Sequence, residues 1–158
     1  RAERSCEGSM INPSSNYAHS VTGLLDVPAE AAFAFMADPI ALGQWSLGCM
    51  NTQRVKKTKI HTGHSLFDGM QGFFEIETDS DRLIVDYRLG SPEHMVPRVS
   101  ARIMPADICG LGKEQCYVTL TAWRATDMDD ARWHRLCVTH EAEIYLIKSQ
   151  CEKKFSLG

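Results

Sequence analysis

The feature that most constrains the fold is an apolar stripe along the C-terminal part of the chain. Between Asp127 and Phe155, six residues recur at alternating spacings of four and three, which places them on one narrow side of an α-helix: Trp133, Cys137, His140, Ile144, Ile147 and Cys151. We predict one helix over 127–155, with Asp127 as its N-cap. Such a helix is roughly 42 Å long at about 1.5 Å per residue, so the rest of the chain must supply a surface that covers the stripe.

The segments before this helix predict a sheet. Apolar and polar residues alternate between turn-forming sequences, and this pattern indicates strands at 17–26, 47–57, 64–69, 73–78, 82–89, 96–104 and 115–124. Two short helices are expected at 29–37 and 39–45, and a loop at 105–114. Short connections between successive strands favour antiparallel pairing, so the expected class is α+β.

Composition narrows the choice of partners and location. The formal net charge is −3 and the isoelectric point about 6.1, which argues against a general nucleic-acid partner. No apolar run reaches the ~18 residues that indicate a transmembrane helix, and the N-terminal sequence has no signal-peptide pattern. The six cysteines include no CxxC pair, so we expect free thiols and a cytoplasmic location rather than a disulfide framework.

The chain is long enough for one domain. Residues 1–8 are charged and aperiodic, and we expect 1–16 to be a flexible segment or one foreign to the native protein, followed by a ligand-binding domain over 17–158. The sequence has no Gly-rich phosphate loop, GxSxG or HExxH motif, so nucleotide-dependent and common hydrolase chemistries find no support.

The middle of the stripe carries the most informative polar residues. His140 is either a core histidine that hydrogen-bonds to the sheet or a group that faces a cavity and moves a proton. Glu143 follows three residues later, about 60° around the helix. This spacing can present two metal ligands, but two are too few to define a site. The pair His61 and His64 is expected to be solvated on a turn, so no metal is predicted.

A cavity between helix and sheet would be lined by one side of each. Tyr87 shares a strand face with Val85, so its hydroxyl is expected to reach such a cavity. Arg98 is either a solvated charge on the outer face or, on the inner face, a group that binds an anionic ligand. His94 lies near the expected cavity mouth. The other candidate ligand contacts, each of which equally suits a closed core, are Trp133, Cys137, Ile144, Phe74, Val85, Val99 and Ile103.

The opening of the chain resembles that of a known superfamily. Residues 21–39 followed by a tryptophan combine a strand, a Pro-x-Glu helix start, a phenylalanine-containing helix and an Asp-Pro break, carried by Pro28, Glu30, Phe33, Asp38, Pro39 and Trp45. This order is similar to the START/Bet v 1-like (SRPBCC) superfamily, which includes polyketide cyclases, dehydrases and lipid-transfer proteins. The resemblance implies a helix-grip fold, in which a seven-stranded antiparallel sheet curls around the C-terminal helix and leaves a ligand cavity between them.

Three functions are compatible with these features. In the first, the protein holds a small hydrophobic or aromatic molecule, and the resemblance implies cyclase or dehydratase chemistry without a cofactor; His140 would be the base, with Tyr87 or Glu143 orienting the substrate. In the second, it carries a lipid or hydrophobic metabolite without chemistry. In the third it is an interaction module, or a homodimer, that uses residues off the stripe: Val138, Tyr145 and Leu146. The sequence leaves open whether the protein is an enzyme.

Overall fold

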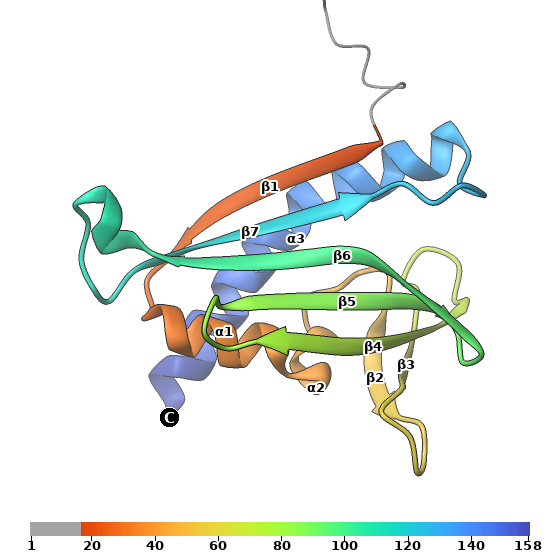
Figure 1. Cartoon of the computed structure of the whole chain (residues 1–158), viewed down its shortest axis with the longest axis horizontal. Coiled ribbons are helices and arrows are strands. Elements are labelled where there is room, and N and C mark those ends of the chain that lie inside the picture. Colours follow the sequence, from red (N-terminus) through yellow and green to blue (C-terminus); the bar gives the residue numbers. More distant parts are fainter. Residues whose placement is uncertain (1–16) are drawn as a thin grey trace, which may run out of the picture.

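The computed structural model describes residues 17–158, in which a seven-stranded sheet and three α-helices form one unit (Figure 1). The strands are β1 (Ala18–Leu25), β2 (Met50–Arg54), β3 (His61–His64), β4 (Gln71–Asp79), β5 (Ile84–Ser91), β6 (His94–Pro105) and β7 (Cys116–Trp123). The helices are α1 (Ala29–Ala37), α2 (Pro39–Leu42) and α3 (Asp130–Leu157), with a 3-10 turn, η2 (Ala106–Cys109), before β7. The expected flexible or foreign segment 1–16 lies outside the described residues.

The sheet confirms the predicted fold class. Its strand order is β1-β7-β6-β5-β4-β3-β2, and all neighbouring strands pair antiparallel. Strands β2 to β7 follow one another as hairpin neighbours, whereas β1 pairs with β7 at the far edge. The long helix α3 crosses one face of this sheet (Figure 1). The architecture is the α+β helix-grip fold, with the two short helices directly after β1.

Helix α3 buries the predicted stripe against the sheet. Its buried residues are Trp133, His140, Glu143, Ile144, Ile147 and Cys151, whereas Cys137 is half-buried. The predicted N-cap at Asp127 is wrong, because the helix begins after Asp129, whose side chain accepts a hydrogen bond from the Arg132 N–H at 2.8 Å. A turn closed by the Met128 N–H and the Ala125 carbonyl at 3.2 Å precedes it, so the backbone at 127 is not yet helical.

Two apolar clusters hold the helix and sheet together. The main cluster joins α1, α2 and the inner face of the sheet to the C-terminal half of α3, with Leu25, Met36 and Ile147 among its fully buried side chains. A smaller cluster at the start of α3 contains Ala122, Met128 and Trp133. Trp133 therefore packs near the N-terminal end of α3, away from the middle of the helix.

Several predicted boundaries are wrong around β2 and β3. Strand β2 is shorter than 47–57, and β3 covers His61–His64, a stretch that was expected to be a solvated turn. The predicted strand at 64–69 is instead a turn, closed by the Gly69 N–H to the Ser65 carbonyl at 2.8 Å, with Gly69 at φ +71°. Glycine adopts this left-handed conformation without a Cβ penalty, which favours the turn over a strand.

Smaller differences concern three other segments. The second helix ends at Leu42 rather than 45, and strand β5 begins at Ile84 because Leu83 has a φ of +53°. The predicted loop at 105–114 contains η2. His94 is the first residue of β6 rather than part of a loop, since Ser91 and His94 pair across a tight hairpin. Across 17–158, none of the helices has the length and apolar character needed to cross a bilayer.

Candidate functional site

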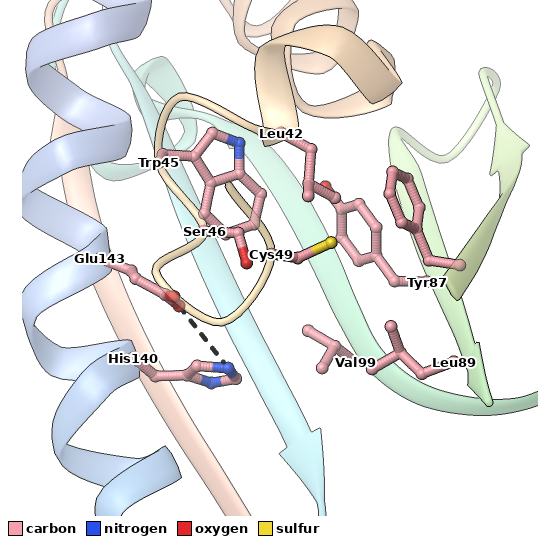
Figure 2. Close-up of a pocket in the computed structure, with 10 residues that line it drawn as sticks. Leu42, Trp45, Ser46, Cys49, Tyr87, Leu89, Val99, His140 and Glu143 are labelled. Carbon is pink, nitrogen blue, oxygen red and sulfur yellow. Dashed lines mark ion pairs between the residues drawn. The ribbon is translucent and has the colours of Figure 1, made fainter. Parts of the chain in front are cut away.

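A cavity of about 50 Å³ lies between α3 and the sheet (Figure 2). Helix α3 contributes polar groups on one side, and the segment after α2 forms an end wall. Strands β4, β5 and β6 supply aromatic and aliphatic side chains opposite α3 (Figure 2). The lining residues are Leu42, Trp45, Ser46, Cys49, Phe74, Tyr87, Leu89, Val99, His140 and Glu143.

The size of this cavity limits what it admits without movement of its walls. Its volume of about 50 Å³ is room for roughly four water-sized atoms, since one water needs about 10–15 Å³ by the same kind of measure. Sites for drug-sized ligands typically have about 300–1,000 Å³. A larger occupant therefore requires that the side chains or the segment around Ser46 and Cys49 move outwards.

His140 and Glu143 lie one helical turn apart and converge on the cavity. Nε2 of His140 is 3.7 Å from Oε2 of Glu143, the contact dashed in Figure 2. The two residues are only 7% and 2% exposed. The other carboxyl oxygen, Oε1, accepts a hydrogen bond from the Leu47 N–H at 2.8 Å, and the Gly48 N–H also donates to this carboxyl group. Glu143 thus ties α3 to the segment 46–49.

Burial moves the pKa values of these two groups in opposite directions. Desolvation raises the pKa of Glu143 to about 8, although the N–H groups of Leu47 and Gly48 favour its charged form. Desolvation, with a smaller contribution from His19 on β1, lowers the pKa of His140 to about 4. Between these two values the carboxyl keeps its proton and the imidazole is neutral. Such a pair supplies an acid and a base in one apolar site.

Tyr87 and Trp45 form the aromatic part of the lining. The Tyr87 hydroxyl donates a hydrogen bond to the Met36 carbonyl at 2.7 Å, and burial raises the pKa of this phenol strongly. The two rings meet edge to face with centroids 6.1 Å apart. Nε1 of Trp45 and Nδ1 of His140 are buried without a hydrogen-bond partner among residues 17–158. Buried polar atoms normally have one, so each of these two could bond to an occupant.

The structure brings five of the predicted site residues to the cavity: His140, Glu143, Tyr87, Phe74 and Val99. Val85, Ile103 and Ile144 pack in the main core, and Trp133 and Cys137 belong to the smaller cluster. His94 is exposed at the β5–β6 hairpin. Arg98 is half-buried at an irregularity in the β5–β6 pairing, and its Nε donates to the Trp123 carbonyl at 2.9 Å.

Five lining residues were not predicted as site residues: Leu42, Trp45, Ser46, Cys49 and Leu89. Leu89 could have been predicted, because it lies two residues after Tyr87 and therefore on the same strand face. Trp45 was singled out only as part of the opening sequence that resembles the superfamily. The segment 42–49 is short and lacks periodicity, so nothing in its sequence indicated that it closes the cavity.

Metal binding gains no support from the side chains of residues 17–158. No three histidine, cysteine, aspartate or glutamate residues of this part of the chain are grouped closely enough to hold a metal ion. Of the pair His61 and His64, His61 stacks on Phe74 with ring centroids 5.6 Å apart.

Comparison with solved structures identifies the class of fold. No protein-family model matches the sequence, and no curated protein matches it. The ZhuI aromatase/cyclase from Streptomyces sp. R1128 superposes with a TM-score of 0.63 at 14% identity, over 87% of this chain and 94% of that one. A START superfamily protein from Mycobacterium smegmatis gives a TM-score of 0.57 at 12% identity, over 88% and 97%.

A third structure shows the same arrangement within a longer protein. The di-domain aromatase/cyclase BexL from the BE-7585A biosynthetic pathway has a TM-score of 0.64 at 14% identity, over 87% of this chain. The match covers 47% of BexL. Identities this low establish the fold alone: the chain has the START-like helix-grip fold, as its opening sequence implied.

Proposed function

We propose that this protein binds a small hydrophobic molecule between α3 and the sheet and acts on it by acid–base chemistry without a cofactor, as a cyclase or dehydratase. The observation that carries this proposal is the convergence of His140 and Glu143, displaced in pKa in opposite directions, on a cavity with an apolar opposite wall. Two aromatase/cyclases share the fold, and this fold-level analogy agrees with the same reaction class.

In this mechanism His140 accepts a proton from the carbon next to a carbonyl group, while Glu143 gives its proton to the carbonyl oxygen. The resulting enol carbon attacks a second carbonyl of the same molecule and closes a ring. The enol proton then returns to Glu143 and the imidazolium proton goes to the new alkoxide. Removal of a second α-proton by His140, with protonation of the hydroxyl by Glu143, releases water, and His140 passes its proton back to Glu143.

Tyr87 acts as a positioning residue in this scheme. Its hydroxyl is engaged by the Met36 carbonyl, so the ring is fixed as a wall opposite the acid–base pair. Two hydrogen bonds favour the second candidate, a non-catalytic carrier. Bonds within the protein already occupy the Tyr87 hydroxyl and one oxygen of Glu143. An enzyme and a carrier differ in one respect: only the enzyme needs the imidazole of His140.

Location and association are further proposals. The thiols of Cys49, Cys109, Cys116, Cys137 and Cys151 are free, which suits a reducing, cytoplasmic compartment. A homodimer would use the exposed side of α3, where Val138 and Tyr145 are 50% and 74% exposed.

The test has two parts. Native mass spectrometry of protein purified from its host should detect a retained small molecule, and Leu89→Trp, which fills the cavity, should abolish retention, whereas the surface change Ile108→Trp should not. Retention by both variants would place the ligand elsewhere. With the molecule identified, His140→Ala should abolish turnover but keep binding; unchanged turnover would exclude His140 as the base, and an absence of turnover in the wild type would favour the carrier.

A further inference from the structure

We propose that Glu143 selects the charge of the ligand: its carboxyl group admits an uncharged molecule that presents a hydrogen-bond-accepting oxygen and discriminates against ions of the same size. This inference rests on the proposed function, since it concerns the same cavity. It makes Glu143 a specificity-determining residue whether the bound molecule is transformed or only carried.

The first argument is that the cavity lining formed by residues 17–158 offers an anionic ligand no cationic partner. None of the ten lining residues is arginine or lysine. Arg98, the candidate anion binder, is occupied by the Trp123 carbonyl on another part of the sheet. A carboxylate ligand would lose its hydration and meet only neutral and apolar groups, and burial of an unpaired charge is strongly unfavourable.

The second argument is the hydrogen-bonding pattern of Glu143 itself. Both backbone groups that contact it, the N–H of Leu47 and that of Gly48, are donors. Neither can accept a proton from the carboxyl group. Nε2 of His140, at 3.7 Å from Oε2, is too distant for a direct hydrogen bond. Among residues 17–158, a protonated carboxyl group therefore has a donor without a partner, and a ligand oxygen, such as a carbonyl, would satisfy it.

The third argument concerns cations. An ammonium ion carries three donors and a full charge into a cavity whose opposite wall is Phe74, Leu89 and Val99. One of the two carboxyl oxygens is already bonded to Leu47. Burying the ammonium ion together with the Glu143 carboxylate would cost more free energy in lost hydration than one ion-pair contact between them returns. An uncharged acceptor avoids this cost.

The pKa values of the groups around Glu143 define the pH range in which the role of its carboxyl group can be tested. The groups that face Glu143 or its neighbour are His140 on α3, Cys49 in the segment 46–49, Tyr87 on β5 and His19 on β1. Burial raises the pKa of Cys49 to about 11 and strongly raises the pKa of Tyr87. It lowers the pKa of His140 to about 4. Between pH 6.5 and 9, Glu143 is thus the lining group that changes charge, since its pKa is about 8.

The experiment uses three probes of four carbon atoms each: butan-2-one, butyrate and butylamine. Each is titrated into the whole protein at pH 6.5 and pH 9, and binding is followed by the NMR shifts of the Leu47 and Gly48 amides, which contact the carboxyl group. Glu143→Gln is the key variant, because its amide keeps an oxygen for these two N–H groups, keeps a donor for the ligand and cannot ionise. Glu141→Gln on the exposed side of the same helix is the matched control.

We expect the wild-type protein at pH 6.5 to bind butan-2-one at least tenfold more tightly than either ion. At pH 9 the affinity for butan-2-one should fall about tenfold, since only about a tenth of the carboxyl groups remain protonated. In Glu143→Gln the affinity should be the same at both pH values, and Glu141→Gln should behave as the wild type does.

Butyrate or butylamine binding as tightly as butan-2-one would overturn charge selection and leave the proposed ligand site intact. A pH-independent affinity for butan-2-one in the wild type would also overturn it. Failure of all three probes to bind, together with the absence of any retained molecule in native mass spectrometry, would remove the proposed function and this inference with it.

Discussion

Replacement of Glu143 by glutamine should stabilise the protein, and the gain should increase with pH. The carboxyl group is 2% exposed and keeps its proton up to a pKa of about 8, against an ordinary value of 4.5. Between these values the unfolded chain binds fewer protons at this position than the native protein does. The wild type therefore loses stability as the pH rises through this window, whereas glutamine does not titrate.

The magnitude follows from the same two values. At about 1.4 kcal/mol per pKa unit, the gain approaches about 5 kcal/mol above the native pKa and is about 3 kcal/mol at pH 7. In a domain of this size, 3 kcal/mol corresponds to a rise in melting temperature of roughly 6–12 °C. The glutamine oxygen can accept the hydrogen bond from the Leu47 N–H, and glutamine has nearly the size of glutamate, so the packing around position 143 is retained.

The measurement is urea unfolding of the wild type, Glu143→Gln and Glu141→Gln between pH 5 and pH 9. His140 has a native pKa of about 4, below the ordinary 6.5, so it adds stability as the pH rises from 4 to 6.5. This contribution is common to the three proteins and cancels in their differences. The reasoning is refuted if the difference between Glu143→Gln and the wild type is flat across this range or shrinks as the pH rises.

Three further changes test the fold. Asp129→Ala should cost about 1 kcal/mol in urea unfolding because it removes the N-cap of α3, whereas Asp127→Ala should cost less than half as much; equal losses would contradict the observed start of the helix. Lys57→Gly should gain about 0.5–1 kcal/mol, since Lys57 has a φ of +64°, and a loss would show that this conformation is not strained. Tyr87→Phe should cost about 1–2 kcal/mol by leaving the Met36 carbonyl unpaired, and an unchanged melting temperature would argue against that hydrogen bond.

The sequence predicted the fold because its strongest pattern is long and regular. The spacing of Trp133, His140, Ile144 and Ile147 is compatible with one helix face, and the structure buries all four. Alternation likewise identified the strand faces that carry Val85 and Tyr87. Where a segment is short, as at 42–49 or 61–70, periodicity carries little information, and the outcome depends on turns such as that at Gly69.

The candidate site was predictable where a periodic pattern fixes the side-chain direction: on the helix for His140 and Glu143, and on strand faces for Phe74, Tyr87 and Val99. His140 and Glu143 could be found because helical spacing fixes their relative direction. That Oε1 of Glu143 accepts a hydrogen bond from the Leu47 N–H could not, since this contact joins positions 96 residues apart. Trp133 and Cys137 share the stripe with His140, but the cavity occupies only the middle of the stripe, and its length cannot be derived from spacing.

The pairing of β1 with β7 has a consequence for how the protein is made. Ser20 and Thr121 meet across these strands although they are 101 residues apart in the chain. During synthesis β1 emerges from the ribosome before β7, so it has to wait without its partner strand until residue 123 is exposed. Helix α3, which shields the inner face, emerges later still. We therefore expect the sheet to close late, after β7 has been released.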